Sequence, residues 1–252
     1  MFAKIEELFK KKNVFSHKNQ GITVAKVIEP ASGLELAKEI LYQIIDRKTV
    51  IYLSGGSVAE LYKLLAKEEK ILPGAVGLID ERYGDPLHSN SNQLLIKNTG
   101  LLRYLDILDI PFYSMLQGLP RVETAEIYDQ KIRELNANFP KSVGILGIGP
   151  DGHISGIAPN RSDFKNPVFD AEQKTLLVSE FNDKTGKFKE RVTTTFLGLE
   201  MLDLMIVIAF GSAKQNALDL MFEDGKEEDI PARFLRRPGV AEKTLLITDQ
   251  NV

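Results

Sequence analysis

Residues 50–67 read VIYLSGGSVAELYKLLAK and join a strand pattern directly to a helix pattern. Val50 to Leu53 is an apolar run of the length expected for a buried strand, and leucines recur on one helix face between Val58 and Lys67. The polar turn Ser54-Gly55-Gly56-Ser57 separates the two patterns. A strand that leads straight into a helix is the unit from which parallel α/β sheets are built.

The same alternation continues along the chain. Strand patterns are expected at 22–28, 50–53, 75–79, 143–148, 174–179, 204–210 and 243–248, with a further candidate at 111–115. Helix patterns are expected at 32–46, 58–67, 93–98, 123–138 and 212–222. The polar segment 181–191, FNDKTGKFKER, is expected to be a surface hairpin or loop. The sequence therefore predicts an α/β fold: one doubly wound, Rossmann-like domain over residues 1–252, with a mainly parallel sheet.

Composition narrows the functional classes. The formal net charge of −3 gives no electrostatic basis for binding nucleic acid, and the absence of cysteine excludes thiolate metal sites and thiol nucleophiles. No apolar run approaches membrane-spanning length, and the N-terminal residues lack the apolar core of a signal peptide. We expect a soluble cytoplasmic protein that does not bind membranes, and the sequence leaves monomer and dimer open as its oligomeric state.

In doubly wound folds, ligands bind outside the carboxyl ends of the strands, and the first candidate site follows the strand at 50–53. Gly55 and Gly56 let the backbone approach a ligand, and Ser54 and Ser57 supply hydroxyl groups. The N–H groups at the start of the following helix favour an anion such as phosphate. The alternative interpretation is an N-capped turn with no ligand. The glycine spacing is neither that of a P-loop nor that of a dinucleotide site.

The second candidate site is LIDERYGDPLHSNSN, residues 78–92. The strand delivers Asp80, Glu81 and Arg82 to its carboxyl end, and adjacent carboxylates point to opposite sides, so only one is expected to face a ligand. Arg82 can bind a phosphate through two hydrogen bonds. The alternative is a solvated charged loop, and we interpret His88 as an ordinary loop histidine.

The third candidate site is GILGIGPDGH, residues 144–153. Gly147, Gly149 and Gly152 allow the chain to turn sharply after the strand and bring Asp151 close to His153. A carboxylate beside an imidazole fixes its tautomer and allows it to act as a base near neutral pH. The chain contains only three histidines, at 17, 88 and 153, and their separation shows no metal-binding spacing.

The fourth candidate is FGSAKQNAL, residues 210–218, where a strand again leads through a turn into a helix. Lys214 lies in the first turn of that helix, where the helix dipole disfavours a cation unless an anion compensates. An exposed lysine without a ligand is the alternative interpretation. Together with Arg82, Lys214 suggests a second contact to phosphate.

These motifs, in this order, resemble those of the superfamily of 6-phosphogluconolactonases and glucosamine-6-phosphate isomerases or deaminases. The resemblance covers nearly the whole chain and also includes PAR at 231–233 and the strand LLITD at 245–249. It implies the Rossmann-like fold that this superfamily shares with ribose-5-phosphate isomerases and CoA transferases. It also implies a small sugar phosphate as ligand, with no metal and no cofactor.

Within the superfamily, the chain is more similar to the lactonase branch. The positions that match its pattern are Asp80-Glu81-Arg82, Ser91-Asn92, Pro150-Asp151-Gly152-His153 and Pro159. The deaminase branch typically has Tyr where this chain has Arg82, and a glutamate where it has Ala158. Three segments depart from the lactonase pattern: Val58-Ala59, Gly84-Asp85 and Gly156 to Pro159 (GIAP).

The resemblance implies hydrolysis of 6-phosphogluconolactone to 6-phosphogluconate, a step of the oxidative pentose phosphate pathway. His153 is expected to act as general base on water, with Asp151 orienting it. The expected substrate-binding residues are Ser54, Gly55, Gly56, Ser57, Asp80, Arg82, Asn92, Gly149 and Lys214. Two alternatives stay open: an isomerase or deaminase that uses Asp80 as its base, and a sugar-phosphate-binding protein without turnover.

Overall fold

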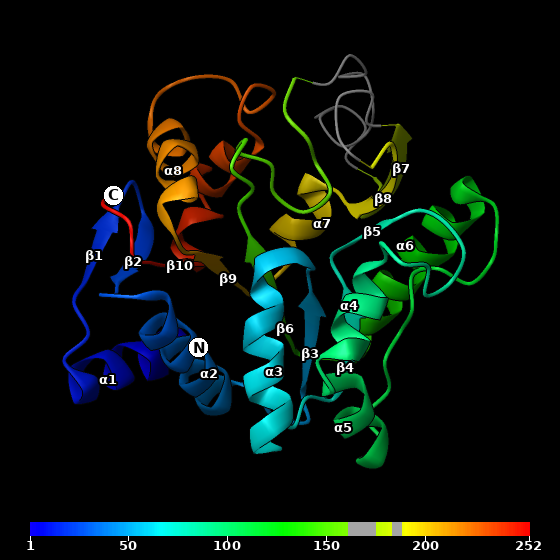
Figure 1. Ribbon diagram of the computed structural model, residues 1–252, viewed down its shortest axis with the longest axis horizontal. Coiled ribbons are helices and arrows are strands. Elements are labelled where there is room, and N and C mark those ends of the chain that lie inside the picture. Colours follow the sequence, from blue (N-terminus) through cyan, green and yellow to red (C-terminus); the bar gives the residue numbers. More distant parts are fainter. Residues whose placement is uncertain (161–174, 183–187) are drawn as a thin grey trace.

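The computed structural model describes residues 1–160, 175–182 and 188–252 of the chain (Figure 1). The strands are β1 (Ser16–Asn19), β2 (Ile22–Lys26), β3 (Thr49–Leu53), β4 (Ala75–Leu78), β5 (Asp80–Arg82), β6 (Lys141–Gly147), β7 (Val178–Asn182), β8 (Glu190–Thr194), β9 (Leu204–Ala209) and β10 (Thr244–Thr248). The α-helices are α1 (Phe2–Lys12), α2 (Pro30–Ile44), α3 (Ala59–Glu68), α4 (Asn92–Asn98), α5 (Leu101–Ile107), α6 (Arg121–Asn138), α7 (Phe196–Glu200) and α8 (Gln215–Phe222). Short 3₁₀ turns are η1 (Gly56–Val58), η2 (Ser212–Lys214), η3 (Pro231–Arg236) and η4 (Ala241–Lys243).

A mostly parallel central sheet, as predicted, forms the middle of the molecule. Within the described residues its strand order is β1-β2-β10-β9-β6-β3-β4, and only the β1–β2 pair is antiparallel. Strands β3 (TVIYL) and β9 (LMIVIA) are buried at every position, as expected for parallel strands with both faces covered. Helices α2 and α3 lie side by side in front of this sheet in Figure 1.

The strand order places a crevice at the carboxyl ends of β3 and β6. From β3 the chain moves to β4 on one side and then returns to β6 on the other side of β3. A reversal of this kind separates the loops that follow the two strands and leaves a crevice between them. The segments 54–57 and 148–153 follow β3 and β6 and therefore border this crevice.

A second, antiparallel sheet of order β5-β8-β7 lies beside the central sheet, and the sequence patterns did not predict it. Asp80 of β5 lies opposite Thr193 of β8, and Phe181 of β7 lies opposite Arg191 of β8. The expected hairpin at 181–191 is confirmed for its described part, while residues 183–187 lie outside the described residues. Of the strand expected at 174–179, only Val178 and Ser179 are strand, and residue 174 lies outside the described part.

One other local expectation differs from the structure, and some elements of the structure were not expected. The candidate strand 111–115 is reduced to a single bridge between Phe112 and Val76, because Pro111 has no N–H to continue a ladder. Helix α1 and strand β1 were not expected. β1 (SHKN) is polar and only half-buried at alternate positions, so it lacks the apolar alternation that signals a strand. The other predicted elements are present, with small differences at their ends.

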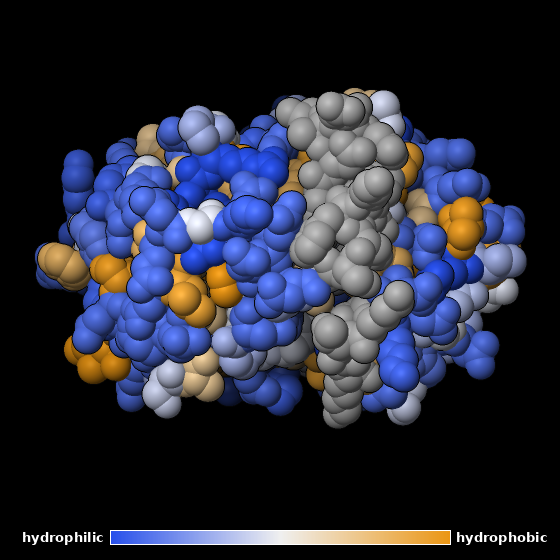
Figure 2. Space-filling model, turned by 90° about the horizontal axis from the view of Figure 1, so that it is seen from above, coloured by the Kyte–Doolittle hydropathy of each residue, from blue (hydrophilic) through white to orange (hydrophobic). Residues whose placement is uncertain are grey.

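The face seen from above in Figure 2 is mostly hydrophilic, and its hydrophobic side chains are confined to small separate groups. Among the described residues, no helix has both the length and the apolar character needed to cross a membrane. The organisation of residues 1–252 as one domain stays a prediction.

Candidate active site

A cleft of about 380 Å³ lies at the carboxyl ends of β3 and β6, where the topology places a ligand site. Every residue predicted for the site lines it: Ser54, Gly55, Gly56, Ser57, Asp80, Arg82, Asn92, Gly149, Asp151, His153 and Lys214. Further lining residues were not among the predicted site residues, namely Gly147, Ile148, Pro150, Ser155, Gly156, Ala158, Phe188 and Arg191. Five segments that are distant in the sequence therefore meet in one cleft.

Two backbone hydrogen bonds of Ser54 fix the start of the turn after β3. Its N–H donates to the Ile145 carbonyl at 3.1 Å, and its carbonyl accepts from the buried Tyr62 hydroxyl at 2.9 Å. Gly56 has φ +75°, a conformation that a side chain would strain. The turn then leads into η1 and α3, and the start of a helix favours an anion.

Asp151 and His153 form the carboxylate–imidazole pair that their spacing predicts. Oδ1 of Asp151 lies 2.6 Å from Nδ1 of His153 and also accepts the His153 backbone N–H at 3.2 Å. Burial opposes ionisation of Asp151, but the hydrogen bonds from His153 prevail and lower the pKa of the Asp151 carboxyl to about 2. The carboxylate is thus ionised at neutral pH and requires a proton on Nδ1, which leaves the lone pair of a neutral ring on Nε2.

Gly149 is required for this pair to form. A Cβ atom at residue 149 would lie 2.0 Å from Nδ1 of His153 and 2.5 Å from Oδ1 of Asp151. The turn is closed by hydrogen bonds from the Gly149 N–H to the His153 carbonyl and from the Gly152 N–H to the Gly149 carbonyl, both at 2.9 Å. The N–H of Ala232, a residue of η3, donates to the Gly152 carbonyl at 3.0 Å, so η3 also stabilises the turn.

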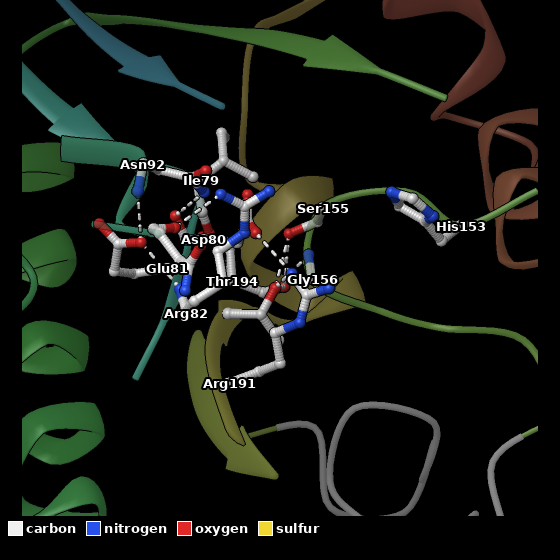
Figure 3. Close-up of polar contacts among 12 residues, drawn as sticks. Ile79, Asp80, Glu81, Arg82, Asn92, His153, Ser155, Gly156, Arg191 and Thr194 are labelled. Atoms are coloured by element: carbon white, nitrogen blue, oxygen red, sulfur yellow. Dashed lines mark hydrogen bonds and ion pairs between the residues drawn. The ribbon is translucent and has the colours of Figure 1, made fainter. Parts of the chain in front are cut away.

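The two adjacent carboxylates of β5 point in different directions, as predicted. Asp80 lines the cleft and is 4% exposed, whereas Glu81 is fully buried and faces the start of α4 (Figure 3). Arg82 returns to the cleft and donates from Nη1 to the Asn90 carbonyl at 2.9 Å. His88 is not among the residues that line the cleft. Its Nε2 lies 2.8 Å from the Arg82 carbonyl oxygen.

Arg191 is the principal cleft residue that the sequence analysis missed. It reaches the cleft from β8, and Nη1 lies 3.5 Å from Oδ2 of Asp80 (Figure 3). The Phe188 ring packs against both arginines, 4.7 Å from Cζ of Arg82 and 5.7 Å from Cζ of Arg191. Burial and the neighbouring Arg191 lower the pKa of Arg82, and Asp80 opposes this. The site thus concentrates positive charge where few solvent molecules can screen it.

Lys214 supplies a third cation from the turn after β9. Its Nζ donates to the Ile148 carbonyl at 2.5 Å, so its charge is directed at the cleft and not at bulk solvent. Burial lowers the pKa of Lys214, and the nearby Asp151 raises it. The lysine at the start of α8 is therefore partly buried at the edge of the cleft.

The GIAP segment, where the chain departs from the lactonase pattern, lines the cleft beside Asp80. Ser155 has φ +57°, and its hydroxyl lies 2.6 Å from the Thr193 hydroxyl, which also accepts the Gly156 N–H at 2.9 Å. A Cβ atom at residue 156 would lie 3.0 Å from Cβ of Thr193 and 3.3 Å from Cβ of Asp80. Gly156 therefore lets this turn pack closely against β5 and β8.

The model of one protein family matches most of the chain. The family is described as glucosamine-6-phosphate isomerases/6-phosphogluconolactonase, and residues 30–245 match it. The chain belongs to this family. The cleft described above is formed almost entirely within the matched residues, so the family assignment and the geometry concern the same part of the molecule.

Relatives in this family are named as lactonases. The chain is similar to the 6-phosphogluconolactonases of Bos taurus and Homo sapiens, each 31% identical over 200 residues that cover 73% of this chain and 72% of the relative. A solved 6-phosphogluconolactonase structure from Thermotoga maritima is 26% identical, with a TM-score of 0.65, covering 91% of this chain and 99% of that one. A structure of the enzyme from Plasmodium vivax, 18% identical with a TM-score of 0.77, covers 98% of this chain and 96% of that one and supports the fold.

Two features of the cleft concern which branch of the family the chain resembles and whether the site could hold a metal ion. Ala158, at the position where the deaminase branch has a glutamate, lines the cleft with a methyl group only. Within residues 1–160, 175–182 and 188–252, no group of three or more His, Asp or Glu side chains is placed to hold a metal ion.

Proposed function

We propose that this protein hydrolyses 6-phospho-D-glucono-1,5-lactone to 6-phosphogluconate, the lactone-opening step of the oxidative pentose phosphate pathway. The observation that carries the proposal is the pairing of His153 with an ionised Asp151 at one side of a cleft that also contains three cations. The family assignment and the names of the relatives support it.

The phosphate of the substrate is assigned to the cations Arg82, Arg191 and Lys214, with the N–H groups of the SGGS turn as further donors. A phosphate carries close to two negative charges at neutral pH, and guanidinium groups bind it through paired hydrogen bonds. Against these three cations the described cleft contains two carboxylates, those of Asp80 and Asp151, and Asp80 forms an ion pair with Arg191. The excess of positive charge favours a dianionic ligand.

His153 acts as the general base in this proposal. Nε2 takes a proton from a water molecule as the water oxygen bonds to the lactone carbonyl carbon C1, and Asp151 stabilises the imidazolium that forms. Backbone N–H groups at the cleft stabilise the tetrahedral oxyanion. The C1–O5 bond then breaks, and the imidazolium returns its proton to O5, which becomes the C5 hydroxyl. The carboxylic acid that forms releases its proton to solvent.

The experiment that tests the proposal measures loss of freshly generated 6-phosphogluconolactone with and without the purified protein. We expect the protein to accelerate hydrolysis well beyond the spontaneous rate, and to release no ammonia from glucosamine 6-phosphate. Ammonia release without lactone hydrolysis would identify the deaminase alternative. Binding of 6-phosphogluconate without any acceleration would identify a protein that binds sugar phosphates without turnover.

A further inference from the structure

Glu81 is a fully buried carboxylate that the proposed mechanism does not use. Oε1 accepts the backbone N–H groups of Arg82 at 2.8 Å and of Asn92 at 2.6 Å, and Oε2 accepts the N–H of Gln93 at 2.9 Å. Asn92 and Gln93 are the first residues of α4. Glu81 therefore ties the start of α4 to the end of β5.

Asn92 extends this connection back to the cleft. Its Nδ2 donates to the Asp80 carbonyl at 2.8 Å, which fixes the orientation of the amide (Figure 3). Oδ1 then points at Gly55 of the SGGS turn, where a Cβ atom would lie only 1.9 Å from it. The Asn92 side chain is 1% exposed and fills the space between Asp80 and Gly55.

We infer that Glu81 and Asn92 are positioning residues that set the separation between the SGGS turn and Asp80. Glu81 holds the start of α4, α4 places the Asn92 amide, and the amide fixes the distance of Gly55 from the end of β5. Neither side chain needs to touch the substrate in this role. The structural part of this inference is independent of the proposed function. Only its expected effects on kcat and KM rest on the proposed function of the cleft.

Asp129 provides a matched control for a purely stabilising carboxylate. It is 6% exposed, lies in α6, and accepts the backbone N–H of Val178 at 3.0 Å and a hydrogen bond from Nε of Arg133 at 2.6 Å. Asp129 does not line the cleft. Asp129→Asn should therefore lower the melting temperature, as Glu81→Gln should, without affecting the SGGS turn.

The first test is hydrogen exchange of the peptide 52–62 in Glu81→Gln, Asn92→Ala and Asp129→Asn. We expect exchange in the SGGS turn to become about 10-fold faster in the first two variants and to stay at the wild-type rate in the third. Wild-type exchange in a folded Asn92→Ala protein would overturn the inference, and this result does not depend on Glu81→Gln folding. No substrate is needed, so the test stands even if the proposed function fails.

The second test is a double-mutant cycle between Gly55 and Asn92. Gly55→Ala should lower kcat/KM by about 100-fold, because its methyl group meets Oδ1, and Asn92→Ala should lower it by about 10-fold, mainly through a higher KM. Since the smaller side chain at 92 makes room for the methyl group, the double variant should resemble Asn92→Ala alone. A loss equal to the product of the two single losses would overturn the inference. A wild-type protein that does not hydrolyse the lactone would instead contradict the proposed function.

Discussion

Nδ1 of His153 lies 2.6 Å from Oδ1 of Asp151, and the carboxylate is ionised at neutral pH because its pKa is about 2. This geometry leaves Nε2 as the basic nitrogen of the pair. His153→Ala should lower kcat for lactone hydrolysis by about 10²–10⁴-fold with the fold intact. The measurement is initial-rate kinetics on fresh lactone, corrected for spontaneous hydrolysis. His17→Ala serves as control and should retain full activity, because His17 lies in β1 and does not line the cleft.

Gly149→Ala should abolish most activity without removing any chemical group. The added methyl group would lie 2.0 Å from Nδ1 of His153, so the imidazole must leave its position beside Asp151. We expect kcat to fall by about 10²-fold or more while circular dichroism stays unchanged. Gly147→Ala is the matched control, because its nearest contact would be an ordinary 3.6 Å to Val58. Equal activity of the two variants would show that the His153 position is not limiting.

Arg191→Lys should mainly impair substrate binding. Lysine keeps the positive charge but lacks the planar fork that binds phosphate through two hydrogen bonds, and it loses the packing against Phe188. We expect KM to rise by about 10-fold with little change in kcat. Arg133→Lys, on the surface of α6, is the control for a general effect on stability. An unchanged KM in Arg191→Lys would remove Arg191 from the phosphate site.

Glu81 should make the stability of the protein depend on pH. Burial raises the pKa of the Glu81 carboxyl to about 7; three backbone N–H donors oppose this shift, and the neighbouring Asp80 acts in the same direction as burial. Because the pKa of Glu81 is higher in the folded protein than in the unfolded chain, where it is near 4.5, protonation of Glu81 stabilises the fold. This stabilisation is fully present below pH 4.5 and is lost as the pH rises through 7. The contribution is on the order of 3 kcal/mol.

Denaturant unfolding between pH 4.5 and 8.5 measures this contribution. We expect the wild-type free energy of unfolding to fall across this range by more than that of Glu81→Gln, whose amide does not titrate. Parallel curves for the two proteins would mean that the Glu81 carboxylate has an ordinary pKa.

Much of the cleft could be predicted because its residues follow strands in the sequence. Asp80 directly follows one apolar run, Asp151 and His153 lie in the short turn after another, and the carboxyl ends of parallel strands meet at one edge of a sheet. The Asp151–His153 contact also depends only on a short turn, so the spacing of two residues was sufficient to predict it. Local patterns were therefore sufficient to predict the Asp151–His153 pair and most of the residues around it.

Arg191 could not be predicted in the same way. It belongs to an antiparallel hairpin whose position in the cleft depends on pairing with β5, more than a hundred residues earlier in the chain. Thr193, which holds Gly156, depends on the same long-range register. The role of Asn92 was likewise set by contacts with Asp80 and Gly55 that no local pattern reveals.

The β8 strand has a consequence for how such enzymes diversify. It brings Arg191 to the cleft from a different sheet than the one that carries His153. Under the proposed function, mutations in the hairpin can therefore alter which anion or sugar is selected, while the Asp151–His153 pair after β6 stays as it is. The reaction chemistry and the substrate selectivity of the cleft can then be changed independently of each other, by evolution or by protein engineering.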